Sequence, residues 1–126
     1  MSPAHRVLIV DDDNEIRETI VEILNDEGYE AVGASDGLEA LAQLRDPEDR
    51  WGLVLLDLMM PNMDGRAFRA EQLLDPAIAP IPVVIVSAMA DVAAAAEELR
   101  VDSHMIKPIP LRDLIQLVRR YCAAAE

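Results

Sequence analysis

Short apolar runs alternate along the whole chain with segments in which apolar residues recur every three or four positions. The runs are rich in Val, Ile, Leu and Ala, and this composition predicts five strands. They lie at residues 6–10, 30–34, 53–56, 83–86 and 104–106. The clearest helical stripes consist of Ile16, Ile20, Ile23 and Leu24, of Leu38, Leu41 and Leu44, and of Leu111, Leu114, Ile115, Val118, Tyr121 and Cys122.

This alternation predicts an α/β fold of five parallel strands and five helices, formed by residues 1–126 as a single domain. Gly28, Pro47 and the pair Asp75-Pro76 stand where helices should end. The first, third and fourth runs are apolar throughout, as expected of strands that helices cover on both faces. Right-handed crossovers favour the flavodoxin-like, doubly wound order 2-1-3-4-5, in which ligands bind at the carboxyl ends of the strands beside strands one and three.

Composition narrows the class of function. The chain has 126 residues, of which 52% are hydrophobic, and its net charge is −13, from 11 Lys and Arg against 24 Asp and Glu. Such a charge repels phosphate backbones, so we expect no direct binding of nucleic acid. The single cysteine, Cys122, allows no internal disulfide and fits a reducing cytoplasm. The run at 7–10 is too short for a signal peptide or a membrane span, so a cytoplasmic domain is expected.

The residues that follow the predicted strands are the candidates for chemistry. Asp11-Asp12-Asp13 follows the first strand, Asp57 the third, Ser87 the fourth and Lys107-Pro108 the fifth. In the expected strand order these groups converge on one edge of the sheet. A carboxylate can act as a nucleophile toward phosphorus. Crowded carboxylates repel one another by roughly 4 kcal/mol per pair at 4 Å and moderate dielectric, which favours binding of a hard cation such as magnesium, Mg²⁺.

At these positions the sequence resembles the receiver domains of bacterial two-component response regulators. The resemblance rests on LIVDDD, LLDLMMPNMDG, VIVSA and HMIKP, in that order along nearly the whole chain. It implies that Asp57 accepts a phosphoryl group from a sensor histidine kinase or phosphotransfer protein. It implies a Mg²⁺ site formed by Asp11, Asp12, Asp57 and the backbone carbonyl of Met59. By the same resemblance Ser87 and Lys107 contact the phosphoryl group, His104 occupies a switch position, and the Lys107–Pro108 peptide bond is cis.

The resemblance also implies how the signal leaves the domain. Phosphorylation would draw Ser87 inward, let the side chain at position 104 swing, and alter the face of helix four, strand five and helix five. That face would bind a downstream protein or a fused output domain, or a second copy in a homodimer. Helix four, expected at residues 90–99, is rich in alanine and should be loosely held.

Several positions depart from the family pattern. Arg100-Val101 replaces the usual Gly-Ala pair before strand five, and His104 stands where Tyr or Phe is more common. Met59 and Met89, each two residues past a site residue, should flank the phosphoryl group and hinder an attacking water.

Structural interpretations of the same residues remain open. Asp13 or Asn14 could cap the first helix, Ser87 could cap the fourth, and Asp64-Gly65 could be a plain turn that starts a helix. His104 is as readily a structural histidine as a switch.

Three classes of function are compatible with this pattern. We favour a phosphorylation-controlled signalling switch that catalyses its own phosphorylation and dephosphorylation only to a limited extent and is not a turnover enzyme. A receiver-like adaptor that binds partners without phosphorylation would be indicated by an incomplete acidic site. A magnesium-dependent phosphohydrolase would carry a second acid in an Asp-x-Asp pair, which Asp57-Leu58-Met59 lacks. Whether the chain acts alone or as part of a longer protein stays open.

Overall fold

The computed structural model describes residues 6–46, 50–88 and 91–122 and contains one parallel sheet. Its strands are β1 (Arg6–Val10), β2 (Glu30–Ala34), β3 (Trp51–Leu56), β4 (Val83–Ser87) and β5 (Ser103–Ile106). They pair in the order β2-β1-β3-β4-β5, which confirms the predicted topology. β3 begins two residues before the predicted start, and its pairing with β1 shifts register between Arg6 and Val7.

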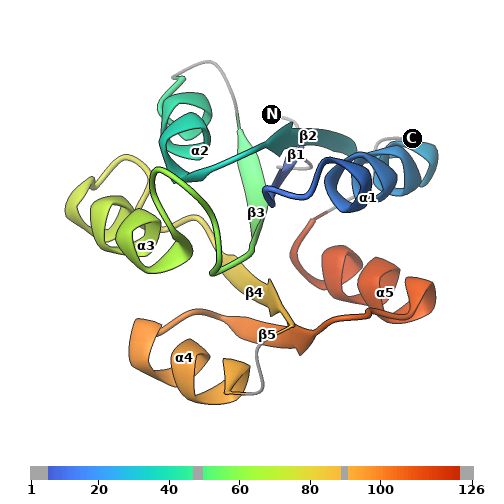
Figure 1. Cartoon of the computed structure of the whole chain (residues 1–126). Coiled ribbons are helices and arrows are strands. Elements are labelled where there is room, and N and C mark those ends of the chain that lie inside the picture. Colours follow the sequence, from blue (N-terminus) through green and yellow to red (C-terminus); the bar gives the residue numbers. More distant parts are fainter. Residues whose placement is uncertain (1–5, 47–49, 89–90, 123–126) are drawn as a thin grey trace.

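Five helices connect and cover the strands. They are α1 (Asn14–Asp26), α2 (Gly37–Leu44), α3 (Gly65–Leu74), α4 (Val92–Leu99) and α5 (Leu111–Tyr121). In Figure 1, α1 and α5 lie on one side of the sheet, and α2, α3 and α4 lie on the other. Alternate residues of β3 reach the two sides: Leu53 and Leu55 pack with the α1 and α5 side, whereas Val54 and Leu56 pack with the α2 and α3 side.

The apolar stripe predicted for α2 is only partly buried. Leu38 in α2 is 54% exposed, whereas the small Ala40 is fully buried with Leu41 and Leu44. The buried stripe of this short helix therefore runs through residues 37, 40, 41 and 44, and Leu38 lies beside it. Leu38 was assigned to the same helix face as Leu41 because the two are three residues apart, but that spacing alone does not fix the centre of a buried stripe.

The helix starts differ between the first and second parts of the chain. Asp13, Asp36 and Asp64 each accept a hydrogen bond from the backbone N–H three residues on, which caps α1, α2 and α3. Within the described residues, Asp91 and Pro110, which precede α4 and α5, form no such side-chain cap. The capping role expected of Asp13 or Asn14 belongs to Asp13.

The ends of the elements follow the predicted breakers where these are described. α1 is followed by Gly28 with φ of 95°, and α3 by Asp75. Pro47 lies outside the described residues, as does Ala90, with which α4 was expected to begin. None of the helices in the described part of the chain combines the length and the apolar character needed to cross a membrane.

Candidate functional site

Two buried aspartates follow neighbouring strands of the sheet. Asp11 comes directly after β1, and Asp57 comes directly after β3. The backbone N–H of Asp57 donates to the carbonyl of Val10 at 2.9 Å, and that of Asp11 donates to Ala34 at 3.1 Å. Both residues therefore continue the ladder of the sheet for one position, which fixes their backbones. Their side chains lie at the carboxyl edge and are 6% and 10% exposed.

Asp12 completes a cluster of three carboxylates with Asp11 and Asp57. One carboxylate oxygen from each of the three lies within 4.8 Å of those of the other two, and Asp12 is the exposed member. These are hard oxygen donors, and the spacing suits a single small cation that the three would share. The residues thus fit the magnesium site that the family resemblance implies.

Lys107 reaches into this cluster from the loop after β5. Its Nζ lies 2.6 Å from Asp11 Oδ2 and 3.2 Å from Asp57 Oδ2, so it bridges the two buried acids. Burial acts to lower the pKa of the Lys107 amine, but the hydrogen bonds and charges of Asp11 and Asp57 outweigh it, and the net shift is upward. The amine stays charged in the site. The following peptide bond, Lys107–Pro108, is cis as expected.

The surroundings of Asp57 oppose its ionisation on balance. Burial raises the pKa of its carboxyl, and the charge of Asp11 raises it further. Lys107 and the backbone N–H of Met59, which donates to Asp57 Oδ1 at 3.2 Å, act in the opposite direction. The net direction is upward. An acid held this way gains from any added positive charge, which is the electrostatic condition for a bound cation.

The loop after Asp57 leads at once into α3 through a close backbone contact. Gly65, the first residue of α3, donates its N–H to Leu58 at 3.0 Å. A Cβ at position 65 would lie 2.7 Å from the carbonyl oxygen of Asp57 and 2.8 Å from Leu58 Cα. Glycine is required here for this approach, so Asp64-Gly65 is more than a turn. In the loop between Asp57 and Gly65, Met59 is 65% exposed at the rim of the site.

Ser87 and His104 occupy different surroundings. Ser87 is the last residue of β4, is 1% exposed and pairs in register with Ile106. It does not cap α4, because Asp91 is the residue that precedes this helix. His104 pairs in register with Ile85 and its side chain is exposed. Met89, the other predicted flanking methionine, lies outside the described residues.

Sequence reasoning missed a residue that holds Asp11 in place. Arg17 of α1 donates from Nη1 to the backbone carbonyl of Asp11 at 2.8 Å and from Nη2 to Asn14 Oδ1 at 2.6 Å. Its side chain crosses β2 at Gly33, where an added Cβ would come within 2.9 Å of Arg17 Cδ. A glycine inside the strand EAVGA was the available signal, because such a glycine often marks the close approach of another group.

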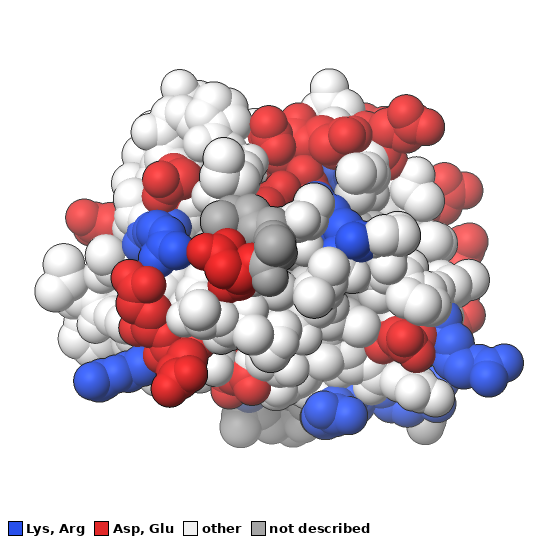
Figure 2. Space-filling view, turned by 60° about the horizontal axis from the view of Figure 1, so that its bottom comes forward, with Lys and Arg blue, Asp and Glu red and all other residues white. Residues whose placement is uncertain are grey.

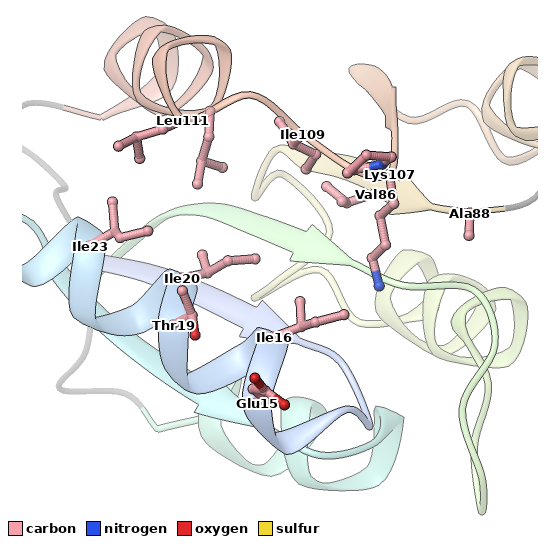
Figure 3. Close-up of a pocket in the computed structure, with 12 residues that line it drawn as sticks. Glu15, Ile16, Thr19, Ile20, Ile23, Val86, Ala88, Lys107, Ile109 and Leu111 are labelled. Atoms are coloured by element: carbon pink, nitrogen blue, oxygen red, sulfur yellow. The ribbon is translucent and has the colours of Figure 1, made fainter.

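An apolar groove opens beside Lys107 (Figure 3). It has a volume of ≈ 580 Å³ and lies between α1 and α5. Ile16, Ile20 and Ile23 of α1 point toward Leu111 of α5 across it, and Leu114 also lines it. Ile16 is 36% and Leu111 is 51% exposed, so the predicted stripes of α1 and α5 are only partly covered at this end. Apolar surface left open in this way is typical of a contact region.

Acidic groups also dominate the outer surface. Figure 2 shows more Asp and Glu than Lys and Arg on one face, with the largest acidic group near its upper right edge. This agrees with the net charge of −13. Such a surface does not concentrate free phosphate compounds by long-range attraction.

The fold and this site define a class of protein. The model of the family described as "Response regulator receiver domain" matches residues 7–119 of the chain. The chain therefore belongs to this receiver domain family of two-component systems.

The chain is similar to full-length regulators and to solved receiver structures. It is 38% identical over 116 residues to the transcriptional regulatory protein PdtaR of Mycobacterium tuberculosis, a match that covers 90% of this chain and 54% of that protein. It is 34% identical over 120 residues to the DNA-binding response regulator MtrA of Mycobacterium leprae, with 90% and 49% covered. It thus spans about half the length of these curated relatives.

Two solved structures have the same fold over nearly all of the chain. A response regulator receiver protein from Pseudomonas putida superposes with a TM-score of 0.85 at 30% identity, over 95% of this chain and 99% of that one. The chemotaxis response regulator CheY4 of Vibrio cholerae gives a TM-score of 0.82 at 26% identity, over 94% and 98%. These likenesses agree with the strand order 2-1-3-4-5 described above.

Proposed function

We propose that the domain is a magnesium-dependent aspartyl-phosphate switch in which Asp57 accepts a phosphoryl group from a sensor histidine kinase or phosphotransfer protein. The observation that carries this proposal is the meeting of Asp57, Asp11 and Asp12 with the Lys107 amine at one edge of the sheet. Three acids and one amine leave the site short of positive charge, which a divalent cation would supply.

Each residue of the site would have a defined task. A carboxylate oxygen of Asp57 attacks phosphorus, the P–N bond of the donor phosphohistidine breaks, and the departing ring nitrogen keeps the electron pair and takes up a proton. Mg²⁺, held by Asp11, Asp12, Asp57 and the Met59 carbonyl, would neutralise charge on the phosphoryl oxygens. Lys107 is positioned to leave its contact with Asp57 and pair with a phosphoryl oxygen, and Ser87 would bind another.

The donor protein would dock in the groove between α1 and α5. The groove lies beside Lys107, and its exposed Ile16 and Leu111 offer apolar contact close to the acceptor. Because the surface is acidic, a protein that presents the phosphoryl group is a more effective donor than a free phosphate compound.

Phosphorylation would change the face formed by α4, β5 and α5, with Ser87 and His104 as switch residues. A downstream protein, a fused output domain or a second copy would read that face, and we place these events in the cytoplasm.

Two other functions receive less support. An adaptor that works without phosphorylation has no need of three convergent carboxylates and a bridging lysine, and this site retains all four. A phosphohydrolase of the Asp-x-Asp type would require an acid at position 59, where a methionine stands.

Intact-mass spectrometry tests the proposal directly. The protein is incubated with acetyl phosphate and Mg²⁺, and we expect a mass increase of one phosphoryl group that is absent in Asp57→Asn and after chelation of the metal. Asp26→Asn, at an exposed position in the last turn of α1, is the matched control and should be modified like the native chain. Modification of Asp57→Asn to the native extent would refute the assignment.

Met59 supplies a test of the phosphorylated lifetime. Its exposed apolar side chain stands at the rim of the site, where it would impede an attacking water. We expect loss of the phosphoryl group to accelerate in Met59→Asn combined with Met89→Glu, followed as the decay of the phosphorylated mass. An unchanged decay rate would remove this role.

A further inference from the structure

A buried arginine joins α3 to the end of α4. Arg69 of α3 is only 6% exposed although its side chain is charged. Its guanidinium donates three hydrogen bonds. Nε donates to the carbonyl of Leu99 at 3.1 Å, Nη2 to the carbonyl of Arg100 at 2.7 Å, and Nη1 to Gln72 Oε1 at 2.7 Å. Leu99 is the last residue of α4 and Arg100 is its C-cap. The cation therefore satisfies carbonyls at the negative end of that helix.

A wider network holds this contact in place. Gln72, fully buried, donates to the carbonyls of Ile78 and Ile81 at 3.1 and 3.0 Å. Asp102 lies near enough to Arg69 to favour its charge, and it also fixes the start of β4. Its Oδ1 accepts from the N–H of Val83 at 3.0 Å, and its own N–H donates to the Val83 carbonyl at 2.9 Å. The polar atoms named here are paired, so the arrangement is specific in geometry.

Burial of this cation has an energetic cost that its surroundings have to offset. Burial lowers the pKa of the Arg69 guanidinium, and the charge of Asp102 counteracts this. An apolar side chain of similar volume would fill the same space without that cost, which makes a role in positioning the natural reason for an arginine here. Arg100 adds to the constraint, since it adopts a left-handed conformation with φ of 55°, where β-carbon-bearing residues are uncommon.

At the other end of α4, the described residues provide apolar packing, with Val92 against Leu58 and Ile85, and no comparable set of polar contacts. Among the described residues, the side chain of Asp91 makes no capping hydrogen bond to the first turn. Val92 is buried there, and an ion pair of 3.1 Å between Arg66 and Glu98 lies again toward the far end. The polar contacts between α3 and α4 thus gather at the C-terminal end of α4. The N-terminal end lies on the side of Ser87, at the carboxyl edge of the sheet.

We propose that Arg69 is a positioning residue that clamps the C-terminal end of α4, so that this helix responds to phosphorylation by pivoting about Leu99 and Arg100 while its N-terminal turn moves. The trigger rests on the proposed function, whereas the clamp is present without it. A partner that binds the α4 face would then find a constant region at the C-terminal turn and a signal-dependent region at the N-terminal turn.

Amide hydrogen exchange along α4, with and without beryllofluoride and Mg²⁺ as a phosphoryl mimic, tests this pivot. In the native protein we expect the exchange of residues 92–95 to change and that of residues 97–101 to stay constant. Arg69→Met keeps the length of the side chain but removes its charge and donors. We expect its residues 97–101 to exchange about tenfold faster even without the mimic, and both ends of α4 to respond when the mimic is added.

Arg66→Met is the matched control, because it removes a cation from the same helix that forms only the more exposed pair with Glu98. It should retain the native contrast between the two ends of α4. If Arg69→Met does not fold, Arg69→Lys and the native protein still decide the question. Equal responses at both ends of native α4 would overturn the pivot.

Amides of residues 57–60 separate failure of the pivot from failure of the proposed function. A response there together with equal responses at both ends of α4 refutes the pivot alone. No response at 57–60 or anywhere in α4 refutes the proposed function and with it the pivot, whereas the clamp is still decided without the mimic, because unchanged exchange of residues 97–101 in Arg69→Met would overturn it.

Discussion

The two parts of the sheet that contribute to the site are built differently. β3, which ends at Asp57, is buried at every position from Trp51 to Leu56, and helices cover both of its faces. β5, which leads to Lys107, alternates between half-buried and exposed residues at the edge of the sheet. The proposed acceptor, Asp57, therefore follows a strand that is buried at every position, and Lys107, which would pair with the phosphoryl group, follows the least buried strand. This arrangement separates a fixed chemical site from a part of the fold that can change.

The last residues of the two strands should show the largest difference. Leu56 is fully buried, whereas Ile106 is 56% exposed. We expect Leu56→Ala to lower the free energy of unfolding by about 2–5 kcal/mol, because it leaves a cavity in the core. Ile106→Ala should cost less than about 1 kcal/mol. Urea unfolding of both variants measures the contrast, and similar losses would show that β5 is as constrained as β3.

The end of α5 should belong to the constrained part, although it follows β5. Cys122 is 4% exposed in the core on the α1 and α5 side, and burial raises the pKa of its thiol from 9.0 to about 11. A raised thiol pKa means that its contribution to stability is full below pH 9 and is lost as the pH rises toward 11.

Comparison with Cys122→Ala isolates this contribution. We expect the stability difference between the native chain and Cys122→Ala to shrink by about 2 kcal/mol between pH 8 and pH 11, because only the native chain has to ionise a buried thiol. Thermal unfolding across this range measures the difference. A constant difference would place the thiol in contact with water.

The helix starts should differ in the same direction. Asp64 accepts from the N–H of Ala67 at 2.9 Å at the start of α3, whereas the side chain of Asp91 caps nothing in the described first turn of α4. Asp64→Ala should therefore cost about 1 kcal/mol. Asp91→Ala should change the free energy of unfolding by less than about 0.5 kcal/mol. Denaturant titration decides, and an equal cost for both would contradict an uncapped α4.

Removal of the charge at Asp57 should stabilise the fold. Burial and Asp11 raise the pKa of Asp57, so the stability of the native chain falls as the pH rises through the folded-state pKa of this carboxyl. Asp57→Asn should then be more stable than the native chain at pH 7, and the advantage should vanish below the ordinary pKa of 3.8. The exposed control Asp26→Asn should show no such gain. A less stable Asp57→Asn at pH 7 would contradict the electrostatic account.

Periodicity and strand ends were enough to predict the fold and the four charged groups that meet at the site. A parallel strand must emerge at the carboxyl edge. Asp11, Asp57 and Lys107 each follow one directly, and Asp12 comes next after Asp11. The roles of Met59, Ser87 and His104 remain predictions.

The buried arginine and its glutamine partner were not predicted. Stripe analysis assigns apolar residues to the interior, and Arg69 and Gln72 are buried because they pair with each other and with backbone carbonyls distant in the sequence. The role of Arg17 was not predicted for the same reason, because its contact with the carbonyl of Asp11 is apparent only in the folded chain.

The absence of a Cβ at Gly65 limits which substitutions this domain can accept. A side chain there would collide with main-chain atoms of Asp57 and Leu58, which cannot move aside by changing a rotamer. A substitution at this position therefore requires the whole connection from Asp57 to α3 to be rebuilt. Redesign of the rim of the site is thus better directed at Met59, whose side chain is exposed, than at the backbone connection on which Asp57 depends.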